Sequence, residues 1–418
     1  MKRRAFMQTL LAGLSMLPAC RVNENSLPHE TVPIPPPDPP APPPADAASR
    51  IFWITKIPDQ PFNVSLPNNH AGIDALLDLM GRNELSFYRR KDSSKQSEAY
   101  GLIAADDVVL VKVNAQWKFR GCTNSDLIRG LVQRILDHPD GFSGEVVIIE
   151  NGQGRGSLHC DTASYYDGHG VHANANDESH SFIYLVDEVF KGKSVSTYLL
   201  DPVRATFISA DEHIIDGYRR LENVSYPCFT TSRGTRVELK EGIWADGAYK
   251  QNLKLINVPV LKHHDRGGSE ITASLKHFYG LLSMSDGQSP ARHYQGLGEA
   301  CGKMVVSARP PVLNIIDAIW VSHQALEGYP AEDTFRANQI LASQDPVALD
   351  YWAAKNVLYP INGDARHHPD FIGIAAWLEA AQNTINGRGG IFNSASGVRT
   401  GNVTRKESEM QVFTASVS

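Results

Sequence analysis

The sequence predicts an α/β fold, with a mixed or mostly parallel Rossmann-like sheet covered by helices and an irregular inserted segment. Short runs that are apolar almost throughout, such as VVLVKV at 108–113 and EVVIIE at 145–150, alternate with stretches whose apolar residues recur at helical spacing. Strands of this kind are buried on both faces, which requires helices on each side of the sheet. The chain has 418 residues, 42% hydrophobic and 21% charged, enough for one large core or two linked subdomains.

The expected elements follow one another in a regular order. The strand at 108–113 leads into a helix in SDLIRGLVQRILDH, for which Ser125 or Asn124 is the expected N-cap. The later expected elements are strands in LKLINVPVL (253–261), PVLNIIDAI (311–319) and NQILAS (338–343), and a helix in DPVALDYWAAKNVL (345–358). This alternation indicates parallel strands joined through helices.

The segment at 156–181, GSLHCDTASYYDGHGVHANANDESHS, has neither a helical nor a strand period. Long irregular loops inside compact domains are uncommon and often functional, so we expect a lid or an inserted subdomain there. Its residue types include those that bind zinc, copper or iron. The metal candidates are His159, Asp161, His169 and His172. No spacing such as H-E-x-x-H accompanies them, so they are candidates by residue type alone.

The first twenty residues, MKRRAFMQTLLAGLSMLPAC, have the pattern of an export signal. A basic start precedes an apolar run that is too short to span a bilayer. Arg3 and Arg4 resemble a bacterial twin-arginine signal, and residues 17–20 (LPAC) resemble the lipobox of bacterial lipoproteins. We therefore expect residues 1–19 to be removed and the thiol of Cys20 to be acylated. The expected location is the bacterial cell envelope, as a membrane-anchored lipoprotein on the periplasmic or outer side.

A proline-rich stretch follows the cysteine. Residues 20–49 contain PHETVPIPPPDPPAPPPADAAS, whose proline density favours extended polyproline II over a packed core. We expect this stretch to be a tether between the lipid anchor and an α/β domain at 50–418. The expected membrane partner is thus reached through Cys20.

Charge and cysteine spacing exclude two further classes. A formal net charge of -6 with no long basic run argues against nucleic acid as a partner. Apart from Cys20, the cysteines are Cys122, Cys160, Cys228 and Cys301. None forms a C-x-x-C pair, so the sequence has no iron–sulfur motif, and any cofactor is unknown. These four residues form either up to two disulfides or buried free thiols.

Charged and coordinating residues concentrate in NVPVLKHHDRGGSEITASLKHFYGLLS at 257–283. The apolar strand ends at Leu261, so Lys262 and His264 are expected at the carboxyl edge of the sheet, where open α/β folds bind ligands. Two glycines allow a tight turn, and Ser269 is the expected N-cap of a helix that begins near Glu270. Backbone amides at such a helix start form an anion site.

The expected helix has a cationic side. At about 100° per residue, the residues that share one apolar stripe are Ile271, Leu275, Phe278 and Leu282. Lys276 and His277 fall roughly opposite, next to the small residues Ala273 and Gly280. Lys276 therefore either reaches along the backbone towards a ligand or lies on the solvent face.

VPVLKHH followed by TASLKHFYGLLS resembles the family known as domain of unknown function 362. In that family an apolar strand ends in a Lys-x-His element, matched here by Lys262 and His264. A helix of the family carries a Lys-Asn near a glycine, matched by Lys276 and Gly280. His277 stands where the family usually has asparagine.

The resemblance extends over most of residues 108–354. VLVKVN matches an early strand of the family through Lys112 and Asn114. The motifs IIDAI and SQDPVALDYWA match later acidic motifs, which supply Asp317, Asp345 and Asp350. The family has no assigned function. Some members add iron–sulfur cysteine motifs, which this chain lacks.

The resemblance implies one cluster at the carboxyl edge of the sheet. The expected members are Lys112, Asn114, Lys262, His264 and Lys276. Clustered ammonium groups repel one another unless an anion neutralises them. The cluster therefore either binds a small anion, with Ser269 and Asp317, Asp345 and Asp350 among the ligand-binding residues, or forms a structural ion network with those aspartates. In the first case Lys262, His264 and Lys276 are the expected catalytic residues. Glu150, in ENGQGRG, is a further candidate carboxylate.

Three functions agree with these patterns. The first is an exported, membrane-tethered enzyme acting on a small anionic or carbohydrate-derived molecule. The second is a redox or metal-binding protein of the cell envelope. The third is a ligand-binding lipoprotein without catalytic activity.

Overall fold

The computed structural model describes residues 49–161, 170–264, 270–283, 293–329, 331–393 and 398–417. The expected signal peptide, Cys20 and the tether up to residue 48 lie outside the described residues, as do Ser269 and His169. Among the described residues, no helix has both the length and the apolar character needed to cross a bilayer.

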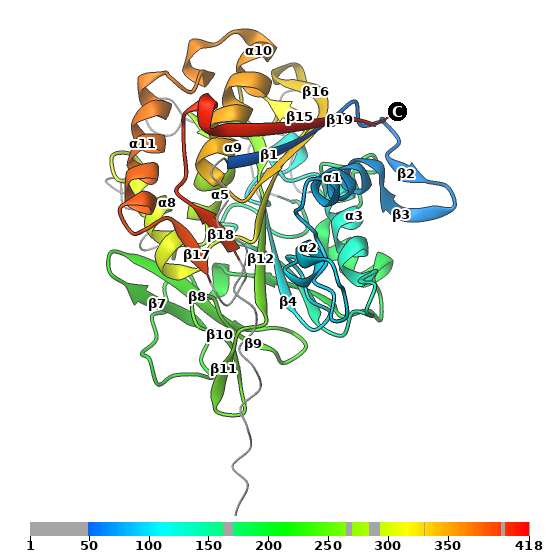
Figure 1. Ribbon diagram of the computed structural model, residues 1–418, viewed down its shortest axis with the longest axis vertical. Helices are drawn as coiled ribbons and strands as arrows, with labels where there is room; N and C mark the ends of the chain where they lie inside the picture. The colour runs from blue at the N-terminus through cyan, green and yellow to red at the C-terminus, as the bar shows by residue number, and fades with distance from the viewer. Residues whose placement is uncertain are drawn as a thin grey trace, which may run out of the picture. The chain divides into compact units, whose positions relative to one another are not determined.

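The main sheet has ten strands, eight of which form one continuous path (Figure 1). Their order is β19 (Met410–Ser416), β1 (Ser49–Thr55), β16 (Thr334–Ser343), β15 (Leu313–Ser322), β12 (Leu253–Val258), β4 (Val108–Val113), β5 (Glu145–Glu150) and β6 (Val195–Leu199). β13 (Val260–His263) runs parallel to β15 and antiparallel to β14 (Ile271–Thr272). Neighbours from β15 to β6 are parallel, whereas β16 is antiparallel to both β15 and β1. The predicted α/β class with a mixed, mostly parallel sheet is confirmed.

Helices cover both faces of this sheet. Figure 1 shows α1 (Ala71–Arg82) and α3 (Ser125–Leu136) on one side, and α5 (Ser274–Tyr279), α8 (Leu297–Lys303), α9 (Pro346–Ala353) and α11 (Ile372–Asn386) on the other. The shorter described elements are α2 (Gln96–Ala99), α4 (Phe182–Tyr184), α10 (Tyr359–Asn362), β2 (Phe62–Asn63), β3 (Leu66–His70), β17 (Ile391–Asn393) and β18 (Val398–Gly401).

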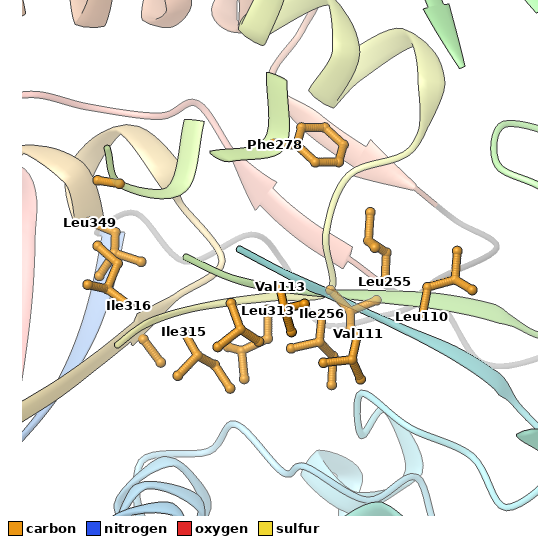
Figure 2. Close-up of a cluster of buried hydrophobic side chains, with 14 of the residues drawn as sticks. Leu110, Val111, Val113, Leu255, Ile256, Phe278, Leu313, Ile315, Ile316 and Leu349 are labelled. Atoms are coloured by element: carbon orange, nitrogen blue, oxygen red, sulfur yellow. The ribbon is translucent and has the colours of Figure 1, made fainter. Parts of the chain in front are cut away.

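The core lies on both faces of the central strands because the side-chain period of a strand is two. In Figure 2, Leu110 and Leu255 point to the side that carries Phe278 of α5, while Val111 and Ile256 point to the opposite side. All four residues of β4 and β12 named here are fully buried. The same alternation places Lys112 and Asn257 on the α5 side, which matters for the site.

A second sheet, inserted between β6 and β12 in the chain, is separate from the main sheet. Residues 217–250 form a separate antiparallel sheet of five strands, ordered β11 (Ala248–Lys250), β10 (Gly242–Ala245), β9 (Arg236–Glu238), β8 (Val224–Thr230) and β7 (Gly217–Leu221). In the segment at 156–181, residues 162–169 lie outside the described residues, and Leu158, Cys160 and Ala173 are buried in the hydrophobic core. The small sheet escaped prediction because its strands are short and β8 contains Pro227, a residue that argues against a strand.

Three element boundaries correct the sequence-based expectations. Asn124, not Ser125, is the N-cap of α3, because its side chain accepts a hydrogen bond from the Leu127 amide at 2.9 Å. The expected helix near Glu270 begins only at Ser274, since residues 271–272 pair with β13 as strand β14. Ser49, expected as the last residue of the tether, is the first residue of β1, opposite Met410.

Candidate functional site

A polar pocket lies at the carboxyl edge of the parallel strands. The strands β4, β5 and β13 each end at this pocket, and α5 also contributes lining residues. Its lining residues are Lys112, Asn114, Gln116, Trp117, Glu150, Asn151, Gln153, Lys262, His264, Thr272, Lys276, His277, Tyr279, Gly280 and Leu326. The cavity volume is about 40 Å³. A single water needs about 10–15 Å³, so the space suits a group as small as a carboxylate or a phosphate.

Five residues named from the sequence meet at this pocket. They are Lys112, Asn114, Lys262, His264 and Lys276. Parallel strands have their carboxyl ends at one edge, which explains why segments that start at residues 108 and 260 reach the same place. The structure therefore brings together the three lysines that the sequence pattern singled out.

Lys112 and Glu150 form a buried ion pair. Lys112 Nζ lies 2.7 Å from Glu150 Oε1 and also donates to the Val113 carbonyl at 3.0 Å. Glu150 accepts two backbone amides as well, from Ala115 and Asn151, each at 2.7 Å. Burial lowers the pKa of Lys112, and the facing Glu150 carboxylate opposes that change. Burial also raises the pKa of Glu150, whereas its three hydrogen-bond donors favour the charged form. Because of these donors, we take the pair to be ionised, with its charges cancelling.

Gly280 lets the end of α5 come close to this ion pair. A Cβ atom at position 280 would lie 3.3 Å from Lys112 Nζ and 3.0 Å from the His277 carbonyl oxygen. That contact is tighter than normal packing, so a larger residue would push the Lys112 ammonium away from the pocket. The glycine of the sequence motif thus has a packing reason.

Lys262 is the most unusual charge in the pocket. Its side chain is buried at 2% exposure, and Nζ donates to the neutral carbonyl of Gly121 at 2.7 Å. Burial lowers the pKa of Lys262 to about 7, and the charge of Lys276 acts in the same direction. Opposing contributions come from Cys122, Glu327 and Glu150. The amine is therefore close to half neutral at physiological pH, the state in which lysine acts as a base or nucleophile.

The short helix α5 is held in place by Asp350 of α9. The Asp350 carboxylate accepts the backbone amides of Ser274 at 2.7 Å and Leu275 at 2.9 Å. These are the first two residues of α5, whose own N-cap, Ala273, has no side-chain acceptor. A distant carboxylate thus caps the helix that carries Lys276 and His277.

Lys276 is buried, not on the solvent face. Its side chain has 8% exposure, and Nζ lies 5.1 Å from the ring centroid of Tyr279, one turn further along α5. A cation over an aromatic face is attracted by the ring quadrupole. Both residues line the pocket, so the aromatic ring helps to hold this ammonium beside the ligand space.

His277 has a defined tautomer. Its Nδ1 lies 2.7 Å from Asn257 Oδ1, while Asn257 Nδ2 donates to the Ser274 carbonyl and to Asn314 Oδ1, each at 2.9 Å. Since the Asn257 amide nitrogen already donates twice, its oxygen must accept, so His277 Nδ1 carries the proton. Nε2 is then a buried lone pair that makes no hydrogen bond to the residues described.

Burial is the main reason why the pKa of His277 lies well below its ordinary value. The charges of Lys112 and Lys262 lower it further, and a contact with the Val113 carbonyl opposes them. The ring is therefore neutral at physiological pH. It adds no positive charge to a pocket that already contains three lysines.

A row of polar residues crosses the sheet beneath α5. Register places Asn257 of β12 opposite Lys112 of β4 and Asn314 of β15, and Asn314 opposite Ser343 of β16. Asn314 Nδ2 donates to the Ser343 carbonyl at 3.3 Å. We call these four residues the polar row. Its hydrogen bonds fix the amide orientation of Asn257 and, through it, the tautomer of His277.

Asn114 and His264 lie at the rim of the strands. Asn114 Oδ1 accepts the Val260 amide at 2.9 Å, which orients the start of β13. The His264 amide donates to the Glu270 carbonyl at 2.8 Å. Both line the pocket, Asn114 with an additional structural role.

The comparisons with known proteins give one match. Residues 228–355 match the family model described as Domain of unknown function (DUF362). This segment is a DUF362 domain. No curated protein and no solved structure matched the chain. The DUF362 segment contains Lys262, Lys276 and His277, while Lys112 and Glu150 precede it, so the pocket combines residues from within and outside the matched range.

Asp317, Asp345 and Asp350, the aspartates expected among the ligand-binding residues, do not line the pocket. Asp317 accepts the amides of Asn124 at 2.7 Å and Ile319 at 3.0 Å. Asp345 accepts those of Val347 and Ala348, each at 2.9 Å, as the N-cap of α9. Asp350 caps α5, as described above. Burial raises the pKa of Asp317 and of Asp350 to about 7 and that of Asp345 to about 6. These partners give the aspartates structural roles.

The described metal candidates of the irregular segment have different contact partners. Ser157 donates to Asp161, whereas His172 Nδ1 lies 2.9 Å from Glu178 and its ring stacks on Phe119. His159 is exposed. Within the ranges that the structure describes, no three or more His, Cys, Asp or Glu residues are grouped to hold a metal ion.

Several residues of the pocket and of the polar row were not expected from the sequence. Asn257 and Asn314 interrupt apolar strands, and a polar residue in a strand buried on both faces is a signal that was available. Tyr279 and Asn151 gave no such signal. Asn151 Nδ2 donates to the Leu282 carbonyl at 3.0 Å, which joins the end of β5 to the chain after α5.

Proposed function

We propose that this protein is an enzyme acting on a small anionic molecule, such as a carboxylate, a phosphate ester or a sugar acid. The observation that carries the proposal is Lys262, a buried amine held by a neutral carbonyl at the edge of a polar pocket. In this proposal Lys262 accepts a proton from the bound substrate.

The charges of the pocket favour an anion. Glu150 neutralises Lys112, whereas Lys262 and Lys276 lie close enough for the charge of Lys276 to lower the pKa of Lys262. An anionic group between them relieves this repulsion and offsets the cost of burying them. The ammonium of Lys276, steadied by Tyr279, is the second contact for the anion.

Acid–base catalysis needs a group whose pKa lies near the working pH. The pKa of Lys262, about 7, meets this need because the side chain is buried. An ordinary surface lysine, with a pKa near 10.4, is almost fully protonated at neutral pH and cannot act as a base. His277 has a pKa well below its ordinary value, so its Nε2 is a weaker proton acceptor than the Lys262 amine.

Binding and proton transfer are tested separately. Inorganic phosphate and a panel of hydroxy and keto acids are titrated by calorimetry, and bound compounds are followed by NMR in D2O for loss of C–H signal. Lys262→Met is expected to abolish exchange. Lys262→Arg retains a charge but not a base, so it is expected to bind anions without exchange. Lys191→Met, at an exposed residue, is the matched control.

Two results decide against this proposal. If no compound of the panel binds, the anion site is wrong. If compounds bind but no C–H exchange or turnover accompanies binding, the protein is a ligand-binding protein without the proposed catalysis.

We propose further that the chain is exported and attached to a membrane through acylated Cys20. The support is the sequence alone: Arg3 and Arg4, the LPAC pattern at 17–20, and the proline-rich stretch that follows. Cys20→Ser is expected to move the protein from the membrane fraction into the soluble fraction. Unchanged membrane attachment of the variant would contradict the proposal.

A further inference from the structure

Two buried cysteines lie next to each other beside the pocket. Cys122 Sγ is 3.8 Å from Cys160 Sγ, and both side chains are fully buried. A disulfide has an S–S length of about 2.05 Å. To form one, the two sulfurs must approach each other by less than about 2 Å from their distance of 3.8 Å. Cys228 and Cys301, the other described cysteines, are also buried and free.

Hydrogen bonds hold the loops of Cys122 and Cys160 together independently of the thiols. Asn174 Nδ2 donates to the Cys122 carbonyl at 2.9 Å, and the His172 amide donates to the Cys160 carbonyl at 3.1 Å. The Phe119 amide donates to the His172 carbonyl at 2.8 Å. The short distance between the sulfurs is therefore a property of a hydrogen-bonded loop pair.

Cys160 has a backbone conformation that is costly for a residue with a side chain. Its φ is +56°, in the left-handed region that favours glycine. Such strain of about 1–3 kcal/mol persists only where the surroundings impose it. This left-handed conformation occurs at the residue whose Sγ lies 3.8 Å from Cys122 Sγ.

We propose that Cys122 and Cys160 are a dithiol–disulfide pair that fixes the loop supporting Lys262. Gly121, the neighbour of Cys122, supplies the carbonyl that accepts from Lys262 Nζ. Gln116 and Trp117 of the same loop line the pocket. A covalent link at Cys122 therefore acts directly on the partner of the proposed base.

The chemistry requires an acceptor of two electrons. The two thiols lose two protons and two electrons as the S–S bond forms, and a small-molecule disulfide takes them up and leaves as two thiols. Burial raises the pKa of the Cys160 thiol well above its ordinary value, and the neighbouring Cys122 adds to this. Because the thiolate is the attacking form, exchange is expected to be slow at neutral pH and faster in alkali.

The test compares the four buried thiols in the folded full chain. The protein is incubated with glutathione disulfide, quenched by an alkylating reagent in denaturant, and digested for mass spectrometry. The expected result is one cross-linked peptide joining Cys122 to Cys160, with Cys228 and Cys301 alkylated. Cys122→Ser and Cys160→Ser are each expected to lose it.

Two outcomes overturn the proposal. One is recovery of Cys122 and Cys160 as free thiols under conditions in which urea-unfolded chain forms disulfides. The other is cross-linking to Cys228 or Cys301 in the folded protein. The effect on the pocket is read from the rate of acylation of Lys262 before and after oxidation. An unchanged rate despite complete cross-linking removes the link to Lys262, whatever the outcome of the substrate experiments.

Discussion

His277 Nδ1 donates to Asn257 Oδ1 at a distance of 2.7 Å, and this contact leaves Nε2 as the ring nitrogen without a proton. Asn257 is oriented in turn by Asn314 and by the Ser274 carbonyl. His277 of α5 is thereby hydrogen-bonded to the polar row, which has one residue on each of four strands. The side-chain amides of Asn257 and Asn314 each act as both donor and acceptor, so the polar row holds these side chains in fixed orientations.

Replacing Asn257 by leucine is expected to lower the free energy of unfolding by about 3 kcal/mol or more. The change removes the hydrogen bonds that Asn257 makes with His277 Nδ1, the Ser274 carbonyl and Asn314 Oδ1, and each buried unsatisfied group costs about 1–3 kcal/mol. Urea unfolding measures the loss. In the wild type, ¹⁵N NMR should show a protonated Nδ1 and a bare Nε2 at neutral pH, and a proton on Nε2 would refute the assigned tautomer.

Asp350→Asn is expected to destabilise the start of α5 without creating a cavity in the core. The amide keeps one acceptor oxygen for Ser274 or Leu275 but presents an NH₂ group to the other backbone amide. We expect a loss of about 1–3 kcal/mol in unfolding free energy and weaker phosphate binding, because Lys276 and His277 lose their fixed position. Asp364→Asn, which concerns a surface cap of a short helix, is the control for a general effect of removing a carboxylate. Equal phosphate affinity in wild type and Asp350→Asn would contradict a positioning role.

The sheet was predictable because its strands carry their own signal. β4, β5 and β12 are buried on both faces and therefore read as continuous apolar runs. Their parallel order then placed Lys112 and Lys262 at one edge. The convergence of these lysines follows from topology, and no side-chain contact was needed to foresee it.

The start of α5 was not predictable from periodicity. Ile271 fits the helical stripe, but Ile271 and Thr272 pair with His263 and Lys262 as β14, a tertiary contact that overrides local spacing. The capping group, Asp350, lies 76 residues further along the chain from Ser274. An N-cap supplied by another helix leaves no local motif, so the sequence pointed to Ser269 instead.

Lys262 is expected to make stability depend on pH. Its pKa is about 7 in the folded protein because of burial and near 10.4 in the unfolded chain. Between these values the unfolded chain binds a proton that the folded protein lacks, so stability rises with pH, by up to roughly 1.4 kcal/mol per pH unit. This contribution is fully present above the unfolded pKa and is lost as pH falls through the folded value. Urea unfolding from pH 7 to 9 should show a shallower slope for Lys262→Met than for wild type or Lys191→Met. Parallel slopes would mean that Lys262 is not buried in this way.

The pair of Lys112 and Glu150 is expected to behave as one unit. Glu150→Gln leaves a buried ammonium without its counter-charge, and breaking a buried pair in this way costs about 3–5 kcal/mol. The double variant Lys112→Met/Glu150→Gln removes both charges and should recover part of that loss, although the amides of Ala115 and Asn151 then face a neutral acceptor. Urea unfolding of the wild type, both single variants and the double variant gives the coupling energy. If the two single effects simply add, the buried ion pair is not the stabilising contact. The interpretation that Glu150 neutralises the charge of Lys112 is then wrong.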